Sequence, residues 1–166
     1  PLSSICRSWA VSTFWLTFPM DFFSSPKRFV PGIRSRRIST FHLSLIMVRV
    51  VSTGQAKLTK AYNLPAKYVL HTVGPIISGR VTKRDRKLLA SCYRSCLKLA
   101  AENGLQSVAF CCISTGEFHF PHELAADIAV ETVRDFLQRE ASVQKVIFNV
   151  SKDLDKELYE KRLHTR

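Results

Sequence analysis

The chain has 166 residues, of which 46% are hydrophobic, so its length fits one ordinary globular domain and excludes two full domains. Its formal net charge of +12 is typical of a protein whose partner is a nucleic acid, an acidic membrane surface or a phosphorylated ligand. The longest uncharged stretch near the start, residues 8–20, is too short for a membrane-spanning helix and contains Ser, Thr and Pro. We therefore expect no membrane span and no membrane partner.

The positive charge is distributed unevenly along the chain. Residues 1–52 contain seven basic residues and one acid, Asp21, whereas residues 53–166 contain eighteen basic and twelve acidic residues. The second part is only mildly basic, which argues against a nucleic-acid partner for it.

The cysteines indicate a reducing environment. There are five of them, an odd number, and Cys111 and Cys112 are adjacent within an apolar run. That arrangement is poorly suited to a disulfide framework. We therefore predict a cytoplasmic location.

Residues 1–52 show no recognisable element. They hold both tryptophans and many serines and arginines, but neither a sustained helical period nor clean alternation. Three interpretations remain open: a transit-like leader, a basic arm that binds nucleic acid, or a segment that was never selected to fold. Because the chain opens with Pro1 and lacks an initiator Met, a leader would be oddly placed.

The pattern becomes regular from Thr53 onward. Residues 67–73 are a short run of β-forming residues closed by Gly74, which predicts a buried strand. Thr82 and Asp85 have the spacing of a helix start, and Asn103-Gly104 predicts the end of that helix. The apolar residues that share one face of this helix are Leu89, Cys92, Tyr93, Cys96 and Ala100.

Three further elements and a final helix follow. Residues 107–113 and 143–150 predict two apolar strands, and between them Pro121 suits the first turn of a helix that runs through Leu137 with a wide apolar stripe. Residues 153–162 predict a short, highly charged helix. Alternating strands and helices with nearly continuous apolar strands are typical of an α/β fold, in which helices cover a parallel sheet.

In such a sheet the ligand crevice lies beyond the carboxyl ends of the strands. This rule places Gly74-Pro75 and Ser114-Thr115-Gly116 on the same rim. The second of these turns leads into a helix start, so its backbone N–H groups could form a cradle for an anion. On the pattern alone, an ordinary connection between a strand and a helix is an equally good interpretation.

Three kinds of side chain within residues 114–121 bear on such a cradle: a glycine, two phenylalanines and a glutamate. Gly116 allows the backbone to approach a ligand closely, and Phe118 or Phe120 could supply an apolar wall for a sugar or a base. Glu117 would repel a phosphate and must therefore point away.

Several ordered blocks resemble the second half of a macro domain, over about residues 53–163. The block Cys-Cys-Ile-Ser-Thr-Gly-Glu-Phe-His-Phe-Pro is similar to the zinc-containing branch, the protein-ADP-ribose hydrolases found beside sirtuin-type ADP-ribosyltransferases. The blocks are TGQAKLT from Thr53, YNLP from Tyr62, KYVLHTVGP from Lys67 and AFCCISTGEFHFP from Ala109.

The resemblance implies a three-layer α/β/α fold, and as partner ADP-ribose or a mono-ADP-ribosylated protein. Its diphosphate and distal ribose would be wrapped mainly by backbone groups of residues 114–118. Asn149 and Ser151 could line the rim of an adenine pocket. The substrate-binding residues expected are Ser114, Thr115, Gly116, Glu117, Phe118 and His119.

The features of the family's first half do not occur in residues 1–52. The missing features are a Gly-Asp-Ile-Thr-like motif, an Asn-Ala-Ala-Asn-like segment and the Cys-x4-His-x-Cys loop that holds zinc in the zinc-containing branch of the family. We therefore expect residues 53–166 to be the C-terminal part of a macro domain and the preceding half to be atypical, missing or out of frame. We name no catalytic residue, and we expect no zinc in this chain and an unpaired edge in its sheet.

Four residues suggest a metal site of their own, namely Cys111, Cys112, His119 and His122. Adjacent strand residues point to opposite faces, so we expect both cysteines to pack as small hydrophobic groups. We expect His71, inside an apolar strand, to be a hydrogen-bonded structural residue.

Two features of the first predicted helix have ordinary structural interpretations. Cys92 and Cys96 lie one turn apart on its apolar face, so we expect them to pack in the core. The charged run of residues 83–87 is expected to be a solvated helix start, with nucleic-acid contact as the alternative.

The leading hypothesis is therefore an ADP-ribose-binding macro domain fragment, related to hydrolases that remove ADP-ribose from proteins. The alternative is a non-enzymatic protein, either a reader of ADP-ribose or a basic nucleic-acid-binding protein.

Overall fold

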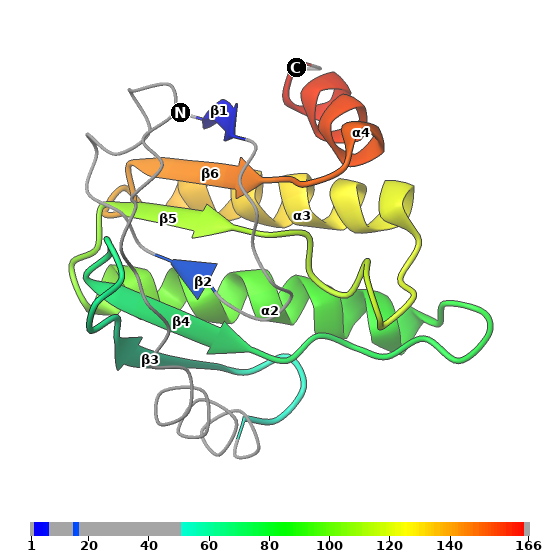
Figure 1. The fold of residues 1–166 in the computed structure, drawn as a ribbon, viewed down its shortest axis with the longest axis horizontal. Coiled ribbons are helices and arrows are strands. Elements are labelled where there is room, and N and C mark those ends of the chain that lie inside the picture. The colour runs from blue at the N-terminus through cyan, green and yellow to red at the C-terminus, as the bar shows by residue number, and fades with distance from the viewer. Residues whose placement is uncertain (1, 7–14, 17–50, 165–166) are drawn as a thin grey trace.

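The computed structural model describes residues 2–6, 15–16 and 51–164, and they form six strands and three helices around one sheet (Figure 1). The strands are β1 (Leu2–Cys6), β2 (Trp15–Leu16), β3 (Ala56–Lys60), β4 (Tyr68–Thr72), β5 (Ser107–Phe110) and β6 (Lys145–Asn149). The helices are α2 (Lys83–Glu102), α3 (His122–Arg139) and α4 (Asp153–His164).

The sheet is mixed, with the strand order β1-β6-β5-β2-β4-β3. β6 pairs in parallel with β5, as predicted for consecutive strands joined by a helix, and it also pairs in parallel with β1. β2 lies between β4 and β5 and is antiparallel to both, so β4 and β5 run in the same direction without touching along their length. The three predicted strands, now β4, β5 and β6, therefore run in the same direction, and the sheet is mixed because the unpredicted strands β2 and β3 run antiparallel to them.

β1 and β2 come from the part of the chain for which the sequence predicted no element. β1 pairs along β6, and β2 fills the position between β4 and β5. The expected unpaired edge at these positions is therefore wrong. The other predictions for residues 1–52 fall on residues outside those that the structure describes.

β3 was not predicted from the sequence. It pairs antiparallel with β4 over five residue pairs, from Ala56 opposite Thr72 to Lys60 opposite Tyr68. Ala56 and Leu58 alternate with Lys57 and Thr59, the period of a half-buried edge strand, and this was the available signal.

α2 begins and ends where the sequence predicted. Thr82 is its N-cap: the backbone N–H of Asp85 donates to Thr82 Oγ1 over 3.2 Å, and the N–H of Thr82 donates to Asp85 Oδ2 over 2.8 Å. This reciprocal capping box satisfies two amides that the first helical turn leaves unpaired. At the other end Gly104 has φ +64°, the left-handed conformation that stops a helix without a Cβ clash.

The remaining elements agree with the predictions in kind and differ at their ends. β5 stops at Phe110 and β6 covers residues 145–149, so both strands are shorter than predicted. α3 begins at His122 with Pro121 as its N-cap, and α4 continues to His164.

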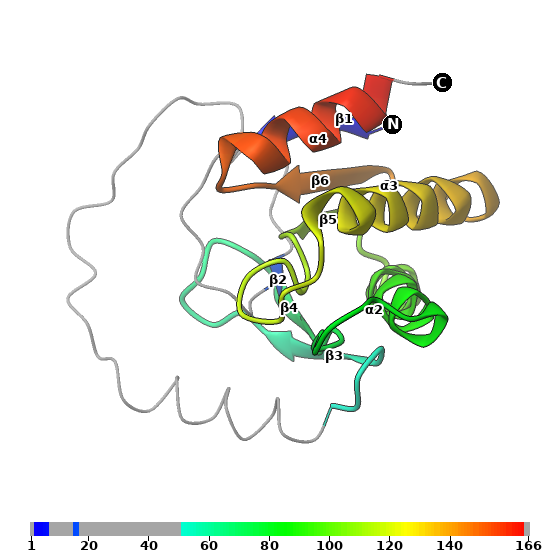
Figure 2. The same ribbon diagram turned by 90° about the vertical axis from the view of Figure 1, so that its right-hand side faces the viewer.

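α2 and α3 cover one face of the sheet, and α4 packs against α3 beside β6 (Figure 2). Four aromatic rings link these layers: Tyr93 of α2 meets Phe110 of β5, which stacks on Phe148 of β6, which meets Tyr159 of α4. Their ring centroids are 4.8 to 6.3 Å apart, within the range of favourable aromatic pairs.

The strands β4, β5 and β6 are buried on both faces. Val108 and Phe148 belong to the core beneath the helices, whereas Val69, Ala109 and Ile147 point to the opposite side and are 3 to 7% exposed. This two-sided burial explains the continuous apolar strands of the sequence and agrees with the expected α/β architecture. No helix in the described part of the chain is long and apolar enough to cross a bilayer.

Candidate functional site

The loops that follow β4, β5 and β6 all leave the sheet at the same end (Figure 1). This end is where the sequence placed the ligand crevice. The loop between β5 and α3, residues 111–121, carries most of the predicted site residues.

A compact set of hydrogen bonds folds this loop back on itself. The N–H of Phe120 donates to the carbonyl of Ser114 over 2.9 Å, and the N–H of His119 donates to the carbonyl of Gly116 over 3.0 Å. Ser114 and His119 adopt left-handed backbone conformations, with φ of +63° and +55°. These two reversals are uncommon for residues that carry a Cβ, and they concentrate at binding loops.

The turn leaves a row of backbone donors without acceptors. Within the described chain, the N–H groups of residues 114–118 donate to no backbone or side-chain oxygen. Successive N–H groups of this kind, just before a helix, form a site for an anion. The N–H groups of the predicted cradle are therefore free to bind an anion. The geometry alone does not identify that anion.

The loop after β4 holds the cradle in place. The N–H of Ile77 donates to the carbonyl of Phe118 over 2.9 Å. A Cβ placed on Gly74 would lie 2.0 Å from Ser114 Oγ and 2.6 Å from Ile113 Cγ2, so only glycine fits there. The hydroxyl of Ser114 is buried and has no hydrogen-bond partner among the described residues.

The side chains of the loop divide into exposed and buried groups. Gly116, Glu117 and His119 are exposed, and Phe118 is half-buried. Phe120 is only 1% exposed and belongs to the core, so its predicted role as a ligand wall is wrong and Phe118 is the one aromatic of this loop that could serve. Gly116 has open space around its Cβ direction and no left-handed φ, so the fold itself does not require glycine there.

Asn149 and Ser151 follow β6 at the same edge of the sheet. Asn149 Oδ1 is buried and accepts no hydrogen bond from a described residue, whereas Ser151 is exposed. Among the described residues no hydrogen bond joins Asn149 or Ser151 to residues 114–118, so their place on an adenine rim stays a prediction.

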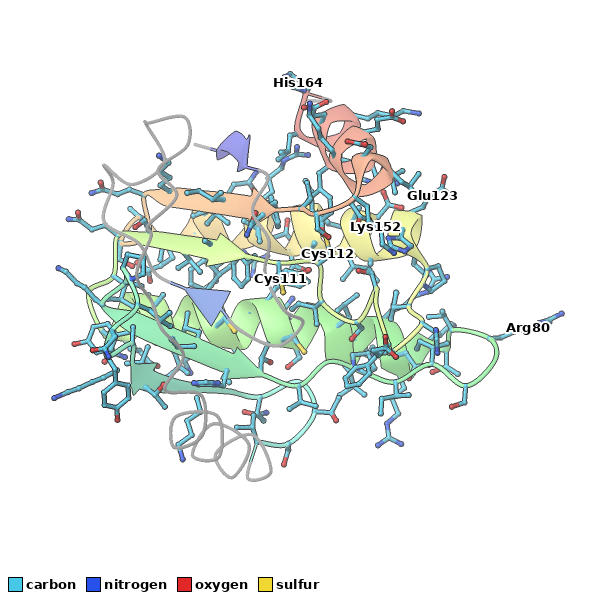
Figure 3. The ribbon with its side chains drawn as sticks, viewed as in Figure 1. Arg80, Cys111, Cys112, Glu123, Lys152 and His164 are labelled. Atoms are coloured by element: carbon cyan, nitrogen blue, oxygen red, sulfur yellow. The ribbon has the colours of Figure 1, made fainter. Side chains whose placement is uncertain are left out.

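The candidates for a metal site are engaged in other ways. His122 Nδ1 lies 2.5 Å from Asp155 Oδ1, a hydrogen-bond contact between α3 and α4 in which the aspartate is 3% exposed. Cys111 and Cys112 lie beyond the end of β5, which stops at Phe110 (Figure 3), so the strand-alternation argument for them is wrong. Both cysteines nevertheless pack partly against the core.

The chemistry of these groups does not fit a zinc site. Burial raises the pKa of the Cys111 thiol to about 12, and burial and the nearby Asp155 carboxylate also raise the pKa of Cys112. Zinc is bound by thiolates, which such pKa values disfavour. In the described chain no group of three or more His, Cys, Asp or Glu side chains is placed to hold a metal ion. We derive no chemical step through zinc.

The other titratable and thiol residues behave as structural groups. His71 is 4% exposed, and its Nε2 lies 2.8 Å from Thr59 Oγ1. Burial, reinforced by Lys57, lowers its pKa. Cys92 and Cys96 are fully buried in the core, and the Cys92 thiol donates to the carbonyl of Val73. The structural interpretation of these three residues is confirmed.

Residues 42–129 match the model of the family described as the macro domain. The chain belongs to the macro domain family. The match begins upstream of Thr53, so the family signal is not confined to the region where the sequence resemblance began.

Two curated relatives share this macro domain. A protein-ADP-ribose hydrolase of Treponema medium is 62% identical over 109 residues, and one of Staphylococcus aureus is 55% identical over 112 residues. These alignments cover 66% and 67% of the chain. They cover 42% of each relative, so the chain spans less than half the length of either.

The fold agrees with solved macro domain structures. The crystal structure of the Trypanosoma brucei macrodomain in complex with ADP superimposes with a TM-score of 0.62 and 40% sequence identity. The superposition covers 68% of this chain and 46% of that one.

Proposed function

We propose that this macro domain binds ADP-ribose at the carboxyl edge of its sheet, with the backbone of residues 114–118 holding the diphosphate. The observation that carries this proposal is the row of N–H groups without acceptors in that loop. Hydrogen bonds from backbone N–H groups to an anion are charge-assisted and therefore stronger than those to neutral acceptors. The names of the relatives support the choice of ADP-ribose among possible anions.

The sugar or base of ADP-ribose and the amino group of its adenine require different surroundings. The half-buried Phe118 offers an apolar surface for a ribose or a base, and the orphaned Asn149 Oδ1 on the next strand offers an acceptor for an amino group such as that of adenine. Glu117 is exposed and its side chain makes no hydrogen bond with a described residue, so it can turn away from a diphosphate.

Titration calorimetry with ADP-ribose tests the proposal directly. We expect saturation at one equivalent, and weaker heat with ribose 5-phosphate, which lacks the diphosphate and adenine. The absence of heat from folded protein would contradict the proposal. A second titration should use a chimaera in which the first half of another macro domain replaces residues 1–52, and we expect it to bind at least as tightly.

We further propose that the chain is related to the zinc-type branch of protein-ADP-ribose hydrolases. Support comes from the sequence of residues 111–121 and from the names of the relatives. Because the chain contains no Cys-x4-His-x-Cys sequence, we expect residues 1–166 themselves to release no ADP-ribose in a zinc-dependent way. Release that a chelator abolishes would contradict this and direct attention to Cys111, Cys112, His119 and His122.

A basic nucleic-acid-binding protein is the second candidate, favoured by the excess of arginine in residues 1–52. Salt dependence separates the two functions. Binding driven by phosphate neutralisation weakens steeply with salt, whereas a pocket for a single ADP-ribose is less sensitive. Tight, salt-sensitive binding of an oligonucleotide without binding of ADP-ribose would favour this second candidate.

A further inference from the structure

The first two turns of α2 line a hollow of about 510 Å³ that the ligand crevice does not use. We call this hollow the α2 groove. Its described lining consists of Lys83, Arg84, Lys87, Leu88 and Ser91. Three of these side chains are cations and none is acidic, so positive charges border a hollow whose floor is mostly apolar and includes Leu88.

The cations of the α2 groove are not neutralised within the described chain. Lys83, Arg84 and Lys87 are exposed and form no ion pair with a described carboxylate. The nearest acid in sequence, Asp85, is directed to Thr82, whose N–H and hydroxyl both donate to Asp85 Oδ2, over 2.8 and 2.7 Å. The capping box therefore leaves three positive charges available to a partner.

A short series of contacts connects the α2 groove with the crevice. Ser91 Oγ donates to the carbonyl of Gly54 over 2.9 Å, and the N–H of Gly54 donates to the carbonyl of Val73 over 2.9 Å. Val73 precedes Gly74, which packs directly against Ser114 of the cradle. The groove and the crevice thus lie at the same end of the sheet, and Arg80 projects from the loop that joins β4 to α2 (Figure 3).

The charges beside the α2 groove limit the class of partner that it can bind. Residues 1–52 carry seven basic residues and one acid, so they do not complement a basic surface. A nucleic acid is disfavoured by the small number of cations and by a floor of Leu88, which offers no aromatic ring for base stacking. An acidic polypeptide with an apolar side chain matches both the cations and the floor.

We propose that the α2 groove binds an acidic segment of the protein that carries the ADP-ribose group. This inference rests on the proposed function, because a modified protein must present polypeptide beside the crevice when its ADP-ribose enters. The groove would then add affinity and select among modified proteins, while the crevice recognises the group they share.

The first test varies the ligand and leaves the protein unchanged. Two mono-ADP-ribosylated peptides are titrated into the full chain, one rich in glutamate on one side of the modified residue and one with glutamine at the same positions. We expect the acidic peptide to bind about tenfold more tightly at low ionic strength, and the difference to shrink with added salt. Equal affinities would overturn the proposal.

The second test varies the protein. In K83E/R84E/K87E we expect the preference for the acidic peptide to disappear, with the affinity for free ADP-ribose unchanged. A matched control is K60E/K67E/R139E, which changes the net charge equally at three exposed residues on the opposite end of the sheet. We expect this control to keep the preference, and its loss in both variants would overturn a specific role for the groove.

The free ligand separates failure of this inference from failure of the proposed function. If ADP-ribose binds and both peptides bind equally, the inference alone is wrong. If neither ADP-ribose nor either modified peptide binds to folded protein, the proposed function is wrong and the inference falls with it. Tighter binding of a single-stranded oligonucleotide, abolished in K83E/R84E/K87E, would assign the groove to nucleic acid and overturn the proposal.

Discussion

The loops after β4 and β5 meet at the carboxyl edge of the sheet, and the glycines they contribute lie in different surroundings. Gly74 is enclosed, because a Cβ there would collide with Ser114 Oγ and Ile113 Cγ2. Gly116 has no atom within 4 Å of its Cβ direction. The first glycine is required by packing, whereas the second is compatible with close approach of a ligand.

This difference separates the scaffold of the site from its binding surface. The β4 loop fixes the β5 loop through Gly74 and through the hydrogen bond from Ile77 to Phe118. The β5 loop can therefore hold its strained residues and its unpaired N–H groups without collapsing onto the protein. A rigid support that leaves donors exposed is what preorganised anion binding needs.

The largest effect is expected for Gly74→Ala. The added Cβ must displace Ser114 and Ile113, so we expect the free energy of unfolding to fall by about 3 kcal/mol, the upper part of the usual range for overpacking. Urea denaturation measures this change. Gly116→Ala is the matched control and should alter stability by less than about 0.5 kcal/mol. Equal effects at the two positions would contradict the comparison.

Gly116→Val should have the opposite profile. The fold accommodates the side chain, but the isopropyl group would hold the loop backbone away from a diphosphate, so we expect ADP-ribose affinity to fall by about tenfold or more. Calorimetry measures the affinity and thermal unfolding checks the fold. Unchanged affinity would show that residues 114–118 are a plain connection between β5 and α3.

Thr82→Ala tests a region whose structure is set locally. The substitution removes the hydroxyl that accepts from the Asp85 N–H, so we expect a loss of about 1 kcal/mol in the free energy of unfolding. Thr53→Ala, at an exposed threonine without a cap, serves as the control. ADP-ribose affinity should stay the same in both variants, and a loss in Thr82→Ala alone would connect the α2 start to the crevice.

The last prediction concerns the pH dependence of stability above pH 9. Burial raises the pKa of Cys111 from 9.0 to about 12, so in this window the folded chain keeps a proton that the unfolded chain releases. The free energy of unfolding should therefore fall as pH rises from about 9 toward 12. Cys111→Ala should show a shallower decline in urea midpoint, and an identical slope would contradict the burial of this thiol.

Local sequence signals predicted most of the elements well. α2 was found at both ends because Thr82, Asp85 and Gly104 act on their immediate neighbours through backbone geometry. β3 was missed although Ala56 and Leu58 alternate, because a short edge strand with polar partners resembles a loop.

The site was only partly predictable. The sequence predicted residues 114–119 as ligand-binding, which stays a prediction, and placed Gly74 on the same rim. It offered Phe118 or Phe120 as an apolar wall, and the side chain of Phe120 fills the core. The run of residues 83–87 was interpreted as a solvated helix start. That three residues of this run line a hollow beside α2 was not predicted.

The sequence by itself determined the helices, the buried strands after Thr53, the edge of the sheet where a ligand would bind and the resemblance to a macro domain. These properties follow from spacing and side-chain type over a few residues. Only the tertiary structure decided the strand order and the contact that makes Gly74 indispensable. Each of these depends on groups distant in sequence meeting in space, and packing of that kind leaves no local periodic signal.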